Sequence, residues 1–437
     1  MPQETQLSLS STNDKGPLLR TMNLTLGLSL GLLLAGLLAA EEQQESSVPQ
    51  PVSASNTHPR GWKEEKNAQE LARRNMDFGF RLLRKLALNS PSKNVFFSPL
   101  SISTGFSLLC LGAQDSTLTE IKQGFNFKGM PERELHQAFH HLLRELNQDK
   151  EDVKLHFGNT LFMDQKLQPQ QKFLRVAKSM YNAETLPANF QDLENTQKQI
   201  NDYVSEETHG RINNLIRNID PGTVMLLTNY IYFRARWQRE FDPKETKEED
   251  FFVSRNRSVK VPMMFRGGLY DMGYDKQLSC TVLEIPYQGN LVATFILPDK
   301  GKMRNLQENL KADVFGRWKK ILVKRVVDVH VPRMHISGTY NLKKTLSQLG
   351  ISKIFEEHGD LTRISPHRSL KVGEAVHKAE LKMNEKGTEG AAGSASETLP
   401  MERPQKFKLN KPYLMMLYET TMPAMIFLGQ ISNPSEK

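Results

Sequence analysis

The sequence predicts an α+β fold in one large domain. Apolar residues recur with helical spacing through most of the stretch from residue 67 to residue 208. Beyond residue 220 the chain is instead rich in short apolar and β-branched runs bounded by turns, which are typical of strands. A mainly helical first part followed by long strands favours the α+β class. No linker-like change of composition divides the chain after about residue 68, so we expect a single domain over residues 67–437.

Three segments precede that domain. Residues 1–21 are polar and form a candidate upstream extension, with Met22 as an alternative initiator. Residues 22–40 form an apolar run that ends in small residues and then meets acidic ones, which predicts a secretory signal peptide cleaved near Ala40. A membrane anchor is the alternative, because the run is close to spanning length. Residues 41–66 are rich in Gln, Ser and Pro and predict a disordered tail on a secreted, extracellular protein.

The secondary-structure elements follow from periodicity. The first helix is predicted from residue 67 onward by apolar residues on one face, and Ser98-Pro99 predicts the start of a second helix. Amphipathic stretches predict further helices at 132–146, 169–181 and 193–208. Strands are predicted at 224–233, 261–265, 280–286, 291–297, 326–331, 375–384, 407–417 and 425–429.

A stretch of small residues near the C-terminus carries the strongest functional signal. Residues 385–404 contain nothing large and apolar before Leu399, so we expect an exposed loop. Its even positions are uncharged and no larger than Thr, whereas Glu389 and Glu397 occupy odd positions. Because alternate residues of a strand face opposite sides, this loop could become a strand with a small inward face. The even positions are Thr388, Gly390, Ala392, Ser394, Ser396 and Thr398.

Several motifs around this loop resemble the serpin family, and within it the antitrypsin-like secreted clade. They are the loop itself, the run from Phe407 to Leu417, the closing run from Phe427 to Pro434, and the motifs at 94–102, 159–162 and 229–237. The resemblance covers roughly residues 68–437. It implies a serpin fold of about nine helices around three β-sheets, with an exposed reactive-centre loop at about 385–404. Tyr413 stands where the family signature usually has Phe.

The resemblance implies a protease inhibitor rather than an enzyme. A serine protease would cleave the Met401–Glu402 bond, after which the loop would insert into a central sheet and trap the covalently bound protease. Unbranched, apolar Met401 indicates a chymotrypsin-like or kallikrein-type target, and we expect the inhibitor to be a monomer. The alternative is a non-inhibitory serpin, acting as a hormone carrier or an extracellular signalling ligand. The expected hinge residues are Glu385, Gly387, Thr388, Glu389, Gly390, Ala391, Ala392 and Gly393, and the bait before Met401 is Thr398, Leu399 and Pro400.

Four further residues resemble serpin positions that control opening of the central sheet. His377 has the inward parity of its predicted strand, and the resemblance implies that it hydrogen-bonds beneath the sheet. Asn229 and Ser101 resemble its partners. Trp237 resembles the packing residue where the loop begins to insert.

Basic residues suggest a polyanion partner. The chain has a net charge of +9 and a pI near 9.3. Arg234 and Arg236 share one strand face, Lys378 and Lys382 point outward by the same logic, and Arg211 is a further candidate. A second cluster around Trp318 comprises Arg317, Lys319, Lys320, Lys324 and Arg325. Either could bind heparin or heparan sulfate, or be only a solvated face. No aromatic stacking array predicts nucleic-acid binding.

Other chemistry is sparse. The chain has no nucleophile elbow, zinc-protease motif or phosphate loop, and we expect no cofactor. His136 and His140 lie four apart on a predicted helix, and an exposed helix face explains them better than a metal site. Two cysteines, Cys110 and Cys280, predict buried free thiols rather than a disulfide framework. Asn256 begins an N-glycosylation sequon in a predicted turn.

Overall fold

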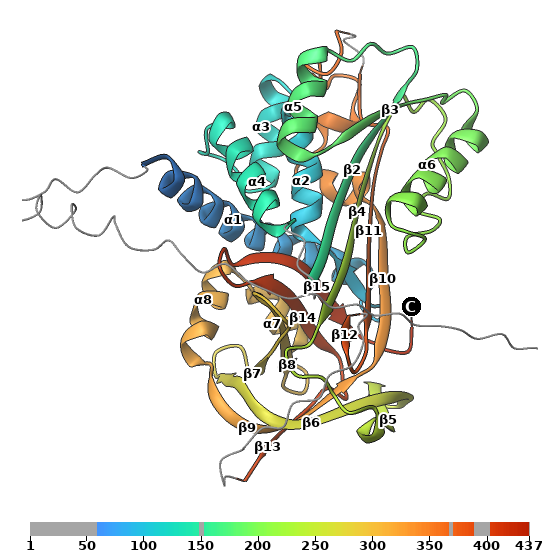
Figure 1. Cartoon of the computed structure of the whole chain (residues 1–437). Helices are drawn as coiled ribbons and strands as arrows, with labels where there is room; N and C mark the ends of the chain where they lie inside the picture. Colours follow the sequence, from blue (N-terminus) through green and yellow to red (C-terminus); the bar gives the residue numbers. More distant parts are fainter. Residues whose placement is uncertain (1–58, 148–152, 367–369, 389–402, 437) are drawn as a thin grey trace, which may run out of the picture. The chain divides into compact units, whose positions relative to one another are not determined.

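The structure describes residues 59–147, 153–366, 370–388 and 403–436. These residues contain two β-sheets and nine α-helices. The structure is a computed structural model (Figure 1). Residues His58–Lys437 form one compact unit. The predicted upstream extension, the signal peptide and the tail up to residue 58 lie outside the described residues. No helix within the described ranges is long and apolar enough to cross a membrane.

The first helix corrects the predicted domain boundary. Helix α1 (Pro59–Asn89) includes residues 59–66, which were expected to belong to a disordered tail. Polar contacts support this first part of the helix: the Lys63 ammonium lies 2.7 Å from a carboxylate oxygen of Glu134. Because polar contacts hold this part of the helix, its sequence has no apolar periodicity. The apolar periodicity therefore predicts a helix only from residue 67.

The central, six-stranded sheet is mixed. Its order is β10 (Met334–Asn341), β11 (Glu374–Met383), β4 (Met225–Arg236), β2 (Val153–Asp164) and β3 (Glu184–Ala188), and the short β12 (Gly387–Thr388) pairs with β4. The pairs β11–β4 and β2–β3 are parallel, while β10–β11, β4–β2 and β12–β4 are antiparallel.

The other sheet has nine strands and combines two of the three sheets that were expected. Strand β6 is the reason: its first part pairs with β5, its last part with β7, and the residues between with β9, so hydrogen bonding is continuous. The order is β1 (Val95–Phe97), β15 (Ala424–Ile431), β14 (Tyr413–Glu419), β8 (Leu291–Pro298), β7 (Cys280–Pro286), β6 (Arg257–Asp275), β9 (Val323–Pro332) and β13 (Gln405–Lys408), with β5 (Lys247–Ser254) on β6.

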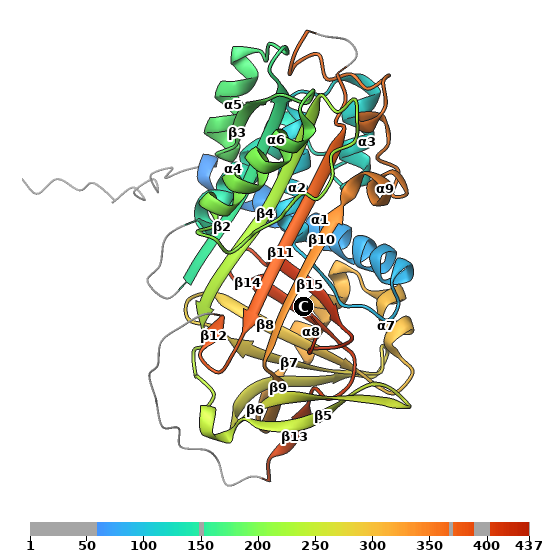
Figure 2. The same ribbon diagram turned by 90° about the vertical axis from the view of Figure 1, so that its right-hand side faces the viewer.

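Helices cover both faces of the six-stranded sheet. Helix α2 lies behind the sheet and α6 in front of it (Figure 2). We call these the inner and the outer face. Helix α2 is buried along its whole length and begins at Ser98, whose hydroxyl accepts a hydrogen bond from Ser101 N. The helices after α1 are α2 (Pro99–Cys110), α3 (Asp115–Gly124), α4 (Glu132–Leu146), α5 (Gln171–Tyr181), α6 (Leu193–Glu207), α7 (Met303–Asn309), α8 (Ala312–Ile321) and α9 (Leu342–Ser347).

Alternation along β4 divides the core between these two faces. Asn229 contacts α2 on the inner face, whereas Tyr230 packs in a cluster with Ile200 and Val204 of α6 on the outer face. Near Arg236, the end of β4 where β12 pairs, the even residues of the strand are only partly buried. The candidate functional site lies at this end of the central sheet.

Candidate functional site

The central sheet divides between β11 and β4. The two strands pair from Glu374 opposite Leu226 to Ala379 opposite Ile231, and beyond that point β11 continues with β10 as its described partner. The chain then turns back, and β12 pairs with the far end of β4, with Thr388 opposite Ala235. The gap between β11 and β4 is therefore already occupied at its open end by the first residues of the loop (Figure 2).

A tight turn brings the loop into that gap. Asn384 N donates to Gly387 O at 2.8 Å, and Gly387 N donates to Asn384 O at 3.1 Å. Gly387 has φ +127°, and a Cβ built there would lie 2.3 Å from the carbonyl oxygen of Ala235. Glycine is required here both by the backbone conformation and by the close approach to β4.

An aromatic pair receives the loop residue that follows. Trp237 stacks on Tyr287 with a ring separation of 4.0 Å, and its indole N–H donates to Asn384 O at 3.0 Å. Thr388 is 1% exposed, and its hydroxyl oxygen lies 3.2 Å from that of Tyr287. Burial raises the pKa of the Tyr287 hydroxyl, which therefore keeps its proton, and either hydroxyl can donate to the other. The side chain of Thr388 thus occupies a small, fully enclosed position.

A buried carboxylate holds the turn in place. Glu385 is 6% exposed, ion-pairs with Arg333 and accepts a hydrogen bond from Thr246 Oγ1 at 2.7 Å. Although burial raises the pKa of Glu385, the hydrogen bonds from Arg333 and Thr246 outweigh it and hold that pKa below its ordinary value. The loop was expected to be exposed from residue 385; its described beginning, Glu385–Thr388, is instead buried and docked.

A polar cluster joins β11, β4 and α2 beneath the paired part of the sheet. His377 Nδ1 lies 2.5 Å from Asn229 Oδ1, which also accepts from Ser101 Oγ at 2.9 Å. Ser98 N donates to His377 Nε2 at 3.0 Å, so this nitrogen is the acceptor and Nδ1 carries the proton. Burial lowers the pKa of His377 to about 3, so the ring is neutral. His377 and Asn229 face each other across the β11–β4 pair.

Comparison with known proteins identifies this arrangement. The family model described as Serpin (serine protease inhibitor) matches residues 73–434. The chain belongs to the serpin family.

Relatives and a solved structure agree with this assignment. Serpin A12 of Rattus norvegicus is 64% identical over 413 residues, which are 94% of this chain and all of that protein. Serpin A12 of Homo sapiens is 62% identical over 416 residues, 95% of this chain and all of that protein. The crystal structure of human thyroxine-binding globulin complexed with thyroxine has a TM-score of 0.81 at 34% identity, covering 85% of this chain and all of that one. The expected serpin fold is confirmed.

Much of the predicted reactive-centre loop falls outside the residues described in this serpin. The hinge residues Glu389, Gly390, Ala391, Ala392 and Gly393, the bait Thr398, Leu399 and Pro400, and the bond Met401–Glu402 lie in the segment 389–402. The chain is described again from Arg403, shortly before β13 pairs in parallel with β9.

The first basic cluster lies on the outer face of this serpin's central sheet. Arg234 and Arg236 project from β4 on the face of Tyr232, whose ring carries the Arg211 guanidinium at 4.7 Å. Lys382 is exposed on β11, and the Lys378 ammonium donates to Asn213 O at 2.8 Å. Burial lowers the pKa of Lys378. Lys154 of β2 stands opposite Arg234 and is exposed. Sequence reasoning missed Lys154, although the alternation at 153–157 predicts an outward position.

Carboxylates pair with most of the second basic cluster. Arg317 lies 2.6 Å from Asp275, Lys319 lies 2.8 Å from Glu284, and Lys324 lies 2.7 Å from Asp271. Trp318 is buried and donates its indole N–H to Asp275 at 2.8 Å. Lys320 and Arg325 are exposed. The positive field of this cluster is therefore weaker than the sequence suggests.

The remaining predicted positions are placed as follows. Asn256 is exposed in the turn between β5 and β6. Cys110 and Cys280 are buried free thiols whose pKa values are raised by burial. His136 does not lie on an exposed face: it is 6% exposed, and its Nδ1 is 2.5 Å from the Tyr181 hydroxyl. The described ranges contain no group of His, Cys, Asp and Glu side chains suited to a metal ion.

Proposed function

We propose that this serpin is a secreted inhibitor that traps serine proteases covalently and is cleaved at Met401–Glu402. The observation that carries the proposal is the docked hinge: Thr388 already pairs with Ala235 in the antiparallel direction that an inserted loop would take. When the loop pairs further along β4 in this register, its even-numbered residues all face the inner side of the sheet. This register places Gly390, Ala392 and Ser394 opposite Phe233, Ile231 and Asn229.

The chemistry uses the protease's own catalytic cycle. The protease serine attacks the carbonyl carbon of Met401, an ester forms, and the peptide C–N bond breaks. Glu402 leaves with a protonated amino group, and water would normally hydrolyse the ester. Loop residues 388–401 can instead insert as a strand, which at about 3.3 Å per residue spans roughly 46 Å. The attached protease would be carried that distance and deformed before hydrolysis.

The sheet supplies both the driving force and the barrier. Insertion gives the loop strand partners on both sides, and serpin loop insertion is a known example of such strand addition. Insertion first requires β11 and β4 to separate along their paired stretch. That stretch runs from the Glu374–Leu226 pair to the Ala379–Ile231 pair. The His377–Asn229 hydrogen bond crosses this seam and opposes early separation. The native state is therefore held kinetically.

Met401 determines the class of target. Its unbranched apolar side chain suits the primary pocket of a chymotrypsin-like or kallikrein-type protease, and Pro404 hinders cleavage after Arg403. To test the bond, the protein is treated with chymotrypsin and the released fragment is sequenced. A new N-terminus at Glu402 is expected, whereas one at Pro404 or within the hinge would refute the assignment.

We further propose that a heparin-like glycan binds the outer face of the central sheet. Arg234, Arg236, Lys382 and Lys154 gather there on neighbouring strands. Bound glycan would raise the rate at which this serpin meets a protease that is bound to the same glycan molecule. Secretion rests on the predicted leader at 22–40, and glycosylation of Asn256 on its exposed sequon.

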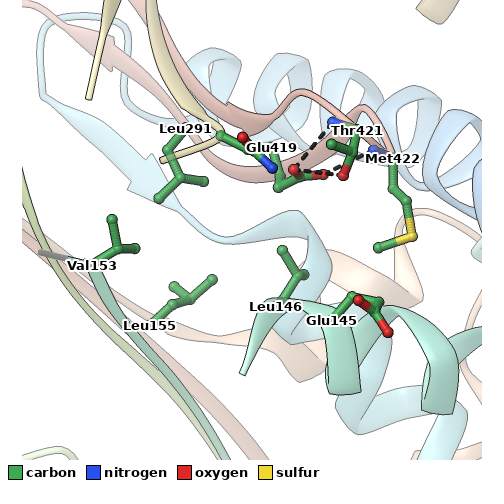
Figure 3. A pocket seen from close by; sticks show the side chains of 9 residues that line it. Glu145, Leu146, Val153, Leu155, Leu291, Glu419, Thr421 and Met422 are labelled. Atoms are coloured by element: carbon green, nitrogen blue, oxygen red, sulfur yellow. Dashed lines mark hydrogen bonds between the residues drawn. The ribbon is translucent and has the colours of Figure 1, made fainter. Parts of the chain in front are cut away.

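A carrier function is the second candidate, and its candidate ligand site is one small cavity. A cavity of about 240 Å³ lies between the end of α4, the start of β2 and the β14–β15 turn, lined by Leu146, Val153, Leu155, Leu291 and Met422 (Figure 3). Glu419 on its wall accepts hydrogen bonds from Thr421 and Met422. The volume is below the roughly 300–1,000 Å³ of typical ligand sites. Saturable binding of an apolar fluorescent ligand, lost in Leu155→Trp, would support a carrier, and no binding would refute it.

A further inference from the structure

Strand β13 holds the chain at the far end of the loop. It pairs in parallel with β9 over residues 405–408, and within the described part of the chain β9 is the only strand that pairs with it. Phe407 is 2% exposed and Leu409 is fully buried, whereas residues 403–406 are exposed. The loop is therefore anchored by a short edge strand whose buried contacts begin only at Phe407.

An intact loop that inserted fully would have to pull β13 away from β9. In the register described above, Thr398 would reach Met225 at the start of β4. Ten strand residues at about 3.3 Å each place it roughly 33 Å from Thr388. Residues 399–404 would then join it to β13, and seven fully extended steps span at most about 25 Å. Because β13 lies beyond the opposite end of β4, near β12, the uncleaved chain cannot reach both places (Figure 2).

A charged cluster fastens β13 to two other strands. The Lys408 ammonium forms an ion pair with the Glu249 carboxylate of β5. The second oxygen of that carboxylate lies 3.8 Å from Nδ1 of His330, which stands opposite Lys408 on β9. Burial lowers the pKa of His330, so its ring is neutral near pH 7 and Lys408 is the cation that meets the charge of Glu249. None of these three side chains is more than 25% exposed, so salt screens the pair only weakly.

Backbone hydrogen bonds hold the chain directly beside this cluster. Phe252 N of β5 donates to Asn410 O at 2.8 Å, and Leu409 N donates to His330 O at 3.0 Å. Strands β5 and β9 thus contact the same three residues, 408–410. Release of β13 has to break these contacts together with the ion pair.

We propose that Glu249 is a positioning residue that keeps β13 anchored, so that the loop is presented as bait and inserts only after cleavage. It acts through Lys408 and not through contact with a protease. Without its carboxylate, Lys408 loses its partner and β13 detaches more often. The anchoring is a property of the native protein. Its effect on the loop rests on the insertion mechanism proposed above, because only a loop that can insert can be lost in this way.

Hydrogen exchange on the full native chain measures the anchoring without any protease. Glu249→Gln should expose the amides of residues 405–410 about fivefold more often, as expected for loss of a partly buried ion pair, while amides of β7 stay unchanged. Glu248→Gln removes the adjacent, exposed carboxylate of β5 and should behave as the wild type. Glu249→Lys combined with Lys408→Glu exchanges the two charges and should restore the protection.

Prolonged incubation of the uncleaved protein measures the consequence for the loop. Glu249→Gln should convert about fivefold faster than the wild type into an intact monomer that resists heating and no longer forms a covalent complex. Wild-type protein cleaved by chymotrypsin provides the reference for the heat resistance of an inserted loop. Glu248→Gln should convert at the wild-type rate.

Separate results would overturn each part. Unchanged exchange at residues 405–410 in Glu249→Gln, or an equal increase in Glu248→Gln, would overturn the anchoring role. If Glu249→Gln does not fold, Lys408→Gln removes the same ion pair from the other side and carries the same expectation. Faster exchange without faster conversion would overturn the effect on the loop. Cleaved wild-type protein that gains no heat resistance would instead refute loop insertion itself, while the exchange experiment still decides the anchoring.

Discussion

Thr388 and Tyr287 place their hydroxyl oxygens 3.2 Å apart, although 101 residues separate them in the chain. This contact fixes the first inward-facing residue of the loop against the aromatic pair of Tyr287 and Trp237. It also fixes the register, since Thr388 stands opposite Ala235 on β4. In the mechanism proposed above, this contact is the first step of loop insertion.

Replacing Thr388 by a long cation should convert the inhibitor into a substrate. Thr388→Arg would bury an unpaired charge against Tyr287, at a cost of several kcal/mol. Covalent complex should fall at least about tenfold, since 1.4 kcal/mol is one factor of ten, while cleavage at Met401 continues. Thr388→Ser keeps the hydroxyl and should retain trapping. Undiminished complex from Thr388→Arg on denaturing gels would remove the docked hinge from the mechanism.

The Arg333–Glu385 ion pair should contribute stability that depends on pH. The pKa of Glu385 is lowered in the native protein, so the stabilisation is present above the ordinary pKa of 4.5 and is lost as pH falls below it. Arg333 is partly exposed, and Arg333→Gln should cost about 1 kcal/mol at pH 7. Thermal unfolding at pH 7 and pH 3.5 measures this. Lys382→Gln, a neighbouring exposed cation, is the control, and an equal loss at both pH values would contradict the account.

His377 should make the native state sensitive to acid. Its pKa is lowered to about 3, so its contribution is complete above the ordinary pKa of 6.5 and is lost as pH falls from 6.5 towards 3. His377→Gln should cost about 1–3 kcal/mol at pH 7, because Ser98 N or Asn229 Oδ1 loses a partner. The variant should then lose less stability than the wild type between pH 7 and pH 4 in denaturant titrations. Parallel pH profiles would exclude His377 as the titrating group.

The outer face of the central sheet should bind heparin more strongly than the cluster around Trp318. Arg234→Ala combined with Arg236→Ala should lower heparin affinity roughly tenfold and reduce the salt needed for elution. Lys320→Ala combined with Arg325→Ala removes the same charge from two exposed positions of the second cluster and should leave elution almost unchanged. If the Lys320 and Arg325 variant instead lost more of the salt needed for elution than the Arg234 and Arg236 variant, the heparin site would lie in the cluster around Trp318.

The sequence predicted those parts of the site that depend on alternation within one strand. In the structure the side chains of Thr388 and His377 point to the inner face, and His377 and Ser101 both contact Asn229. Tyr287 and Arg333 were not predicted, because each contacts the hinge from a strand end or turn distant in the sequence. The docking of Glu385–Thr388 was missed for the same reason: small residues suggest exposure until the strand that covers them is known.

Secondary-structure elements were likewise predicted where the pattern is local and missed where it depends on distant contacts. Predicted ranges for α4 and β7 match the structure because each has a complete amphipathic or buried pattern between clear breaks. Strand β10 was missed, although it borders β11 over its whole length. It contains Ser337, Gly338 and Thr339, and the Gly338 backbone packs so closely on Phe96 O that no side chain fits. The need for glycine comes from packing against a distant segment of the chain, so it produces no periodic pattern in the sequence of the strand.

Denaturing electrophoresis after mixing the mature protein with chymotrypsin, elastase and a panel of kallikreins tests covalent trapping most directly. We expect a band at the summed mass that survives denaturant with at least one of these proteases, together with release of a fragment that begins at Glu402. Complete cleavage after Met401 without such a band, or no reaction with any protease, would contradict the proposal that insertion from Thr388 traps the acyl-enzyme.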